Sequence, residues 1–98
     1  MAKRGPKNQS KHNSKVRKTV NKLKREGWNV KADLPGFQKP GPIGKGNFIP
    51  DIVAKKKGAK RIIEVETPDT MKKDKKQHEA FNRSAAQQNN TTFKIEEA

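Results

Sequence analysis

Residues 51–66 have the sequence DIVAKKKGAKRIIEVE, which is typical of a β-hairpin. Isoleucine and valine are frequent at both ends of this stretch, and β-branched residues favour strands. Gly58 lies between the two apolar runs, where a tight turn is expected. We therefore predict two paired strands over residues 51–57 and 60–67.

The second strand carries two glutamates, Glu64 and Glu66, among residues that otherwise indicate a buried strand. Successive side chains of a strand point to opposite faces, so these two glutamates share a face. Asp51 begins the partner strand. Pairing of Asp51 with either Glu64 or Glu66 would gather all three carboxylates on one face, whereas a shift by one residue would separate them.

Three carboxylates on one face repel one another and need a counter-charge. A divalent cation is one solution, because Mg²⁺ is commonly held by one or two carboxylates with waters and phosphate oxygens. Salt bridges to Lys55, Lys60 or Arg61 are another, and an exposed strand face is a third. The residues of the hairpin alone leave these alternatives open.

Upstream of the hairpin, the sequence predicts a basic helix. Val16, Val20 and Leu23 recur at helical spacing, and Gly27 is a natural stop, so we expect a helix over residues 14–26. Residues 1–13 are basic and polar with almost no apolar side chain, which predicts a disordered basic tail.

Between the basic helix and the hairpin we expect a strand and a long loop. Apolar and polar residues alternate over residues 28–34, and Trp28 is expected to be a core anchor rather than a platform for base stacking. Proline and glycine recur through residues 35–50, which predicts a loop. A loop of this length in a small domain is usually functional or mobile.

Downstream, the sequence predicts a second helix over about residues 71–88 and a short last strand over residues 91–96. The expected order is helix, strand, hairpin, helix, strand. The predicted fold is a single α/β domain over residues 14–98, with a mixed sheet of about four strands flanked by two helices.

The charge of the chain indicates a polyanionic partner. The 98 residues carry a formal net charge of +14, and only 29% of them are hydrophobic. Nucleic acid is the commonest partner of so basic a domain. The sequence has no cysteine, no apolar run long enough for a membrane span and no secretory signal, so we expect a cytoplasmic protein with no membrane partner. The basic side chains expected to contact nucleic acid are Lys15, Arg17, Lys18, Lys22, Arg25, Lys39, Lys45 and Lys73.

The Pro50-Asp51 step, the hairpin turn and the Glu64-Val65-Glu66 run resemble the core of the PD-(D/E)xK, or restriction-endonuclease-like, nuclease superfamily. The archaeal Holliday junction resolvases are the branch most similar to this chain, because their basic helix also ends in a Glu-Gly-aromatic step. The resemblance covers about residues 14–96. It implies that Asp51 and Glu64 bind Mg²⁺ or Mn²⁺, and that the protein cleaves DNA, with branched DNA as a candidate substrate.

Residue Gln77 also resembles part of a family pattern, a glutamine–aromatic helix motif whose glutamine orients DNA near the site. Two departures stand against these similarities. The motif lysine is replaced by Glu66, which could ligate metal or act as a base, and the acidic ligand expected early in the first helix is missing near Lys15. His12 is expected in the tail, and His78 is expected to pack or to lie on the helix surface.

Three functions therefore remain open at the level of sequence. The first is a metal-dependent DNA endonuclease using Asp51, Glu64, Glu66 and Gln77. The second is a catalytically inactive nucleic-acid-binding protein on the same fold, and the third is an unrelated basic RNA-binding protein. A homodimer also stays open, because enzymes that cut both DNA strands often dimerise, although no strongly apolar interface segment stands out.

Overall fold

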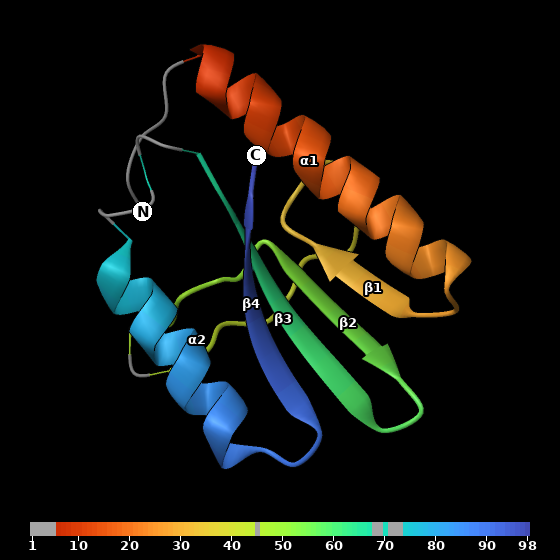
Figure 1. Cartoon of the computed structure of the whole chain (residues 1–98), viewed down its shortest axis with the longest axis vertical. Coiled ribbons are helices and arrows are strands. Elements are labelled where there is room, and N and C mark those ends of the chain that lie inside the picture. The colour runs from red at the N-terminus through yellow and green to blue at the C-terminus, as the bar shows by residue number, and fades with distance from the viewer. Residues whose placement is uncertain (1–5, 45, 68–69, 71–73) are drawn as a thin grey trace.

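A computed structural model describes residues 6–44, 46–67, 70 and 74–98. The chain folds as an α/β domain in which two helices flank a four-stranded mixed sheet with strand order β1-β2-β3-β4 (Figure 1). The predicted fold class and element order are confirmed. The elements are α1 (Pro6–Arg25), β1 (Asn29–Ala32), β2 (Ile52–Lys56), β3 (Ala59–Glu66), α2 (Lys75–Gln87) and β4 (Thr91–Glu97).

The predicted hairpin is formed by β2 and β3, which pair antiparallel. Ile52 lies opposite Ile63, so the next pair outward joins Asp51 to Glu64. This is one of the two registers that gather the carboxylates on one face. The turn between the strands passes through Lys57 and Gly58, which both have positive φ, as the tight reversal requires.

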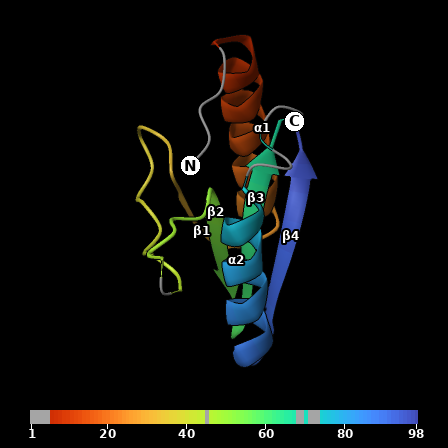
Figure 2. The same cartoon turned by 90° about the vertical axis from the view of Figure 1, so that its left-hand side faces the viewer.

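The last strand, β4, pairs parallel with β3 and places Glu64 beside Ile95. A parallel neighbour requires a crossover, and α2 lies in the connection between β3 and β4. In Figure 2, α2 lies in front of the sheet and α1 behind it. The sheet therefore presents one face to each helix.

The apolar core lies between α1 and its face of the sheet. The stripe formed by Val16, Val20 and Leu23 is almost completely buried, as its helical spacing predicts. It packs against inward-facing strand residues that include Ile52 and Ile63. The opposite face, under α2, holds a smaller aromatic group in which Phe81 lies 5.7 Å from Phe93 and 6.4 Å from Phe48.

The first helix differs from the sequence-based expectation. The prediction of a disordered tail is wrong for residues 6–13, which form the first turns of α1; residues 1–5 lie outside the described residues. Proline is favoured at the first position of a helix, where its missing N–H is not needed, and Pro6 occupies that position. The added turns carry α1 past the end of the hairpin and bring His12 to the sheet.

The loop between β1 and β2 has little regular structure where it is described, as predicted. It contains one isolated bridge between Ile43 and Phe48. The loop also borders the sheet, because the Ala32 amide donates to the Gln38 carbonyl at 2.9 Å and the Asp33 amide donates to the Asp51 carbonyl at 2.9 Å. These bonds fix the residue that precedes β2. Trp28 is half-buried against the core, with the Arg61 guanidinium 4.5 Å from its ring.

Candidate metal centre

Four buried carboxylates meet where β3 ends and α2 begins, and we call them the carboxylate cluster. Its members are Asp51, Glu64, Glu66 and Asp74, whose exposed fractions are 3%, 0%, 0% and 6%. Buried carboxylates are rare unless they are paired or bind a metal. Their concentration in a chain of net charge +14 marks this end of the sheet as a candidate site.

Backbone amides hold both the Glu64 and the Asp51 carboxylates. The Asp51 amide donates to Glu64 Oε1 at 2.7 Å, and the Val65 amide donates to Asp51 Oδ2 at 2.8 Å. The register of the hairpin therefore orients both side chains. The structure brings these two predicted site residues together, as the sequence pattern requires.

The helix α2 supplies the partner of the second Glu64 oxygen. Gln77 is buried and its Nε2 donates to Glu64 Oε2 at 2.8 Å. Phe81 follows one turn later on the same buried stripe of the helix. Gln77, a predicted site residue, thus lies at the cluster and orients the Glu64 carboxylate.

Glu66 is bound by a hydroxyl and a histidine. Thr70 Oγ1 donates to Glu66 Oε2 at 2.5 Å, and His78 Nε2 lies 3.0 Å from Glu66 Oε1. The expectation that His78 packs is confirmed, because its ring lies 6.1 Å from that of Phe93, but it is incomplete, because Nε2 also contacts Glu66. Glu66 is therefore a fixed member of the cluster and not an exposed strand charge.

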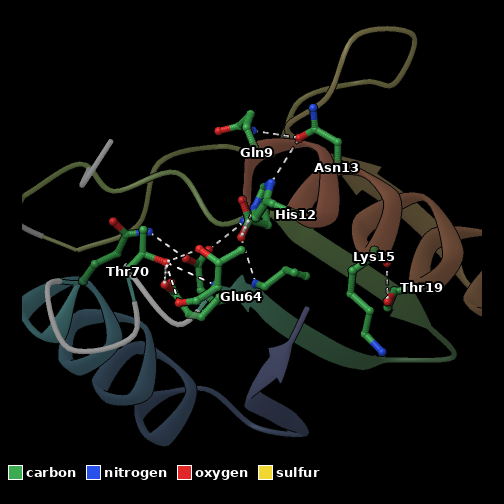
Figure 3. Close-up of polar contacts among 12 residues, drawn as sticks. Gln9, His12, Asn13, Lys15, Thr19, Glu64 and Thr70 are labelled. Atoms are coloured by element: carbon green, nitrogen blue, oxygen red, sulfur yellow. Dashed lines mark hydrogen bonds and ion pairs between the residues drawn. The ribbon is translucent and has the colours of Figure 1, made fainter. Parts of the chain in front are cut away.

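A second histidine reaches the cluster from α1. His12 Nε2 lies 3.1 Å from Asp51 Oδ2, and the His12 side chain is almost completely buried. Figure 3 shows His12 pointing from α1 towards the group around Glu64, with Thr70 on the other side. The prediction that His12 belongs to a tail is wrong. His12 lies on α1, the helix on which the resemblance implied an acidic ligand that this sequence lacks.

Burial and the neighbouring carboxylates disfavour the ionised form of Glu64. Burial, followed by the nearby Asp51 carboxylate, raises the pKa of Glu64 to about 9, and Glu66 and Asp74 act in the same direction. The hydrogen bond from the Asp51 amide opposes this shift without cancelling it. A cation bound at the cluster would relieve the same repulsion.

Three side chains could hold a metal ion together. Glu64, Glu66 and His78 each offer a ligand atom, and these atoms lie within 4.8 Å of one another. The donor chemistry fits, because carboxylate oxygens and an imidazole nitrogen suit Mn²⁺ and related divalent ions. This group differs from the pair that the resemblance implied, Asp51 and Glu64. Glu64 belongs to the group, whereas the Asp51 carboxylate contacts the Val65 amide and His12 at its edge.

The predicted salt-bridge partners of the glutamates do not fill this role in the described part of the chain. Lys60 Nζ lies 3.4 Å from Gln88 Oε1, and Arg61 stacks on Trp28. The ion pairs of the cluster among the described residues are with His12 and His78.

The residues predicted to contact nucleic acid lie mainly on α1. Arg17, Lys18, Lys22 and Arg25 are exposed, and Lys15 is half-buried. Lys39 is exposed in the loop, 4.0 Å from Asp33. Lys45 and Lys73 lie outside the described residues. Within the described chain, neither helix is apolar over a length that could cross a bilayer.

The sequence contained a signal for His12 that the composition of the first residues obscured. His12 stands four positions before Val16, so it continues the buried stripe of α1 by one turn. Thr70 and Asp74 carried no comparable signal, because their role depends on the path between β3 and α2.

Comparisons of the chain with protein-family models, with curated proteins and with solved structures found no match.

Proposed function

We propose that this protein is a metal-dependent DNA endonuclease of the PD-(D/E)xK type, with branched DNA among its substrates. One observation carries the proposal. Asp51 and Glu64 are held by backbone amides on a buried face of the sheet, beside Glu66 and His78, in a chain of net charge +14. The helix–strand order supports it, because it is the order that the resemblance implies.

The roles of the residues follow from their placement. Glu64, Glu66 and His78 would hold Mn²⁺ or Mg²⁺, with Mn²⁺ favoured because Mg²⁺ prefers oxygen ligands. A bound divalent ion would polarise a phosphate oxygen and lower the pKa of an attacking water. Gln77 fixes the Glu64 carboxylate, and Asp51 holds the end of β3 through the Val65 amide.

The basic face of α1 would bind the DNA backbone. Exposed lysine and arginine side chains neutralise phosphates and release counterions, which gives affinity without sequence preference. Arg17, Lys18 and Lys22 lie on the helix that also carries His12 into the cluster. One element thus joins the binding face to the buried site.

The test is a cleavage assay on plasmid, linear and four-way-junction DNA with Mg²⁺, Mn²⁺ or EDTA. Asp51→Asn should lower metal-dependent cleavage about 10- to 100-fold, the scale on which groups that orient a metal site act. Asp33→Asn is the matched control, since Asp33 lies beside Asp51 but pairs with Lys39. Metal-dependent cleavage as fast in Asp51→Asn as in Asp33→Asn would refute the proposal.

Glu66 favours a second function, which is nucleic-acid binding without cleavage. It occupies the position at which the PD-(D/E)xK motif has a lysine that stabilises the transition state, and a glutamate cannot supply that positive charge. The protein would then bind nucleic acid on the same fold without cutting it. Tight, salt-sensitive binding with no cleavage of any of the three DNA forms would establish this alternative.

A further inference from the structure

We propose that two copies of this chain pair through the outer edges of β4 to form a symmetric dimer with one continuous sheet. The strand is long for an edge, with seven residues, and no described element pairs with its outer side. In Figure 2, β4 forms one margin of the sheet. An open edge of this kind is a template for pairing with another strand.

The other edge of the sheet is less available. β1 has only four residues, and the Ala32 amide already donates to the Gln38 carbonyl of the following loop. Short strands and covering loops are ways in which proteins protect an edge. The protection of β1 contrasts with the open, regular β4.

The backbone of β4 is set for antiparallel pairing. The Ala98 amide donates to the Glu66 carbonyl and the Asn90 carbonyl accepts from the Lys60 amide, so even-numbered residues face β3. Odd-numbered residues, including Phe93 and Ile95, therefore direct their N–H and C=O groups outward, because these directions alternate along a strand.

Charge favours one register among those that the backbone allows, because only one of them sets Lys94 opposite a glutamate of the second copy. A two-fold axis at Ile95 places Lys94 opposite Glu96 of the second copy. Moving the axis to Lys94 or to Glu96 would oppose two like charges, which destabilises a strand pair. Within one chain Lys94 Nζ already lies 3.2 Å from Glu96 Oε1, so both side chains occupy the same face and can exchange partners.

The apolar side chains agree with this axis. Among the residues that the structure describes, Ile95 is one of two large hydrophobic residues that are exposed, with an exposed fraction of 38%. Together with Phe93, His78 and Asn82, it lines a shallow groove of about 350 Å³ between β4 and α2. Pairing at Ile95 would bring two such side chains together and cover this groove from the edge.

The local charge also permits association. The chain as a whole carries +14, but residues 89–98 contain two glutamates and one lysine. The β4 edge therefore lacks the excess positive charge that would make two copies repel each other there. A two-fold axis normal to the sheet would set both copies of α2 on one side of the joined sheet.

The mass of the full chain in solution tests the proposal, measured by sedimentation velocity in about 0.3 M NaCl to screen the net charge. The wild-type protein should sediment as a dimer of the 11.1 kDa chain, and Ile95→Arg as a monomer. Ile49→Arg is a matched control, because Ile49 has the same 38% exposure away from β4. A monomeric wild type at every concentration, or equal loss in both variants, would overturn the dimer.

Single-cysteine variants test the register independently of any loss of folding, because the chain has no cysteine of its own. Facing residues of an antiparallel pair lie about 4.5–5.5 Å apart at Cα, within disulfide range. A mixture of Lys94→Cys and Glu96→Cys should form a covalent dimer on oxidation, whereas Lys94→Cys alone should not. Equal cross-linking of Lys94→Cys with itself, or none above an Ile49→Cys control, would refute this pairing.

Neither experiment measures DNA cleavage. Failure of the dimer and failure of the proposed nuclease are therefore separate outcomes.

Discussion

The Nε2 atom of His12 lies 3.1 Å from Asp51 Oδ2, and this contact ties the first helix to the residue that opens β2. Both side chains are buried. The contact links an element rich in exposed lysine and arginine to the carboxylate cluster. It also explains why α1 is ordered well before its apolar stripe begins at Val16.

We expect His12→Ala to lower the free energy of unfolding by about 1–3 kcal/mol, because it leaves the buried Asp51 carboxylate without this partner. The first turns of α1 should also exchange their amide hydrogens faster. Urea denaturation and hydrogen exchange measure the two effects. The neighbouring exposed residue provides the control, and Lys11→Ala should change stability by no more than about 0.5 kcal/mol. Equal effects of the two substitutions would show that the contact contributes nothing specific.

Most of the fold could be predicted because it depends on local patterns. The stripe at Val16, Val20 and Leu23 and the β-branched residues around Gly58 specify elements that bury one face each. The start of α1 could not be placed, since residues 6–13 offer polar side chains whose order depends on contacts with the sheet. His12, for example, lies 3.1 Å from Asp51, a residue of another element.

The site could be predicted in part for a similar reason. Strand periodicity placed Glu64 and Glu66 on one face, and the register then brought Asp51 to Glu64. The path of the chain after β3 is not encoded in any periodicity. The contacts of Thr70 and His78 with Glu66 therefore emerged only in three dimensions.

Glu64 should make the metal-free protein less stable as the pH rises. Its pKa is raised from 4.5 to about 9 in the fold, chiefly by burial, so the folded state binds a proton that the unfolded state releases. The stabilising contribution is complete below about pH 4.5 and is lost as the pH rises towards 9. In EDTA, Glu64→Gln should match the wild type near pH 5 and exceed its stability at pH 8 by at least about 1 kcal/mol.

Urea unfolding at a series of pH values measures this difference. Glu79→Gln is the control, because Glu79 is an exposed glutamate on α2. Parallel pH profiles of the wild type and Glu64→Gln would contradict the raised pKa.

Divalent metal should bind through the imidazole of His78 as well as the carboxylates. His78→Ala should weaken Mn²⁺ binding about 10- to 100-fold, and should affect Mg²⁺ less because Mg²⁺ prefers oxygen ligands. Isothermal titration calorimetry on chelator-treated protein measures both affinities. Asn82→Ala, at an exposed position one turn further along α2, should leave both unchanged. An unaltered Mn²⁺ affinity in His78→Ala would remove the histidine from the ligand set.

DNA affinity should depend steeply on salt through the exposed face of α1. The logarithm of the binding constant falls linearly with the logarithm of salt concentration, by a slope of about 0.9 for each phosphate neutralised. Arg17→Ala and Lys18→Ala should each reduce the magnitude of that slope by about one and weaken binding equally on all sequences, since phosphate contacts carry no base preference. Fluorescence anisotropy over a salt series gives the slope directly. Lys55→Ala removes an equal charge from the exposed end of β2, far along the hairpin from Asp51, and should leave the slope unchanged. If all three substitutions lowered the slope alike, the binding face would not be α1 but the diffuse charge of the whole surface.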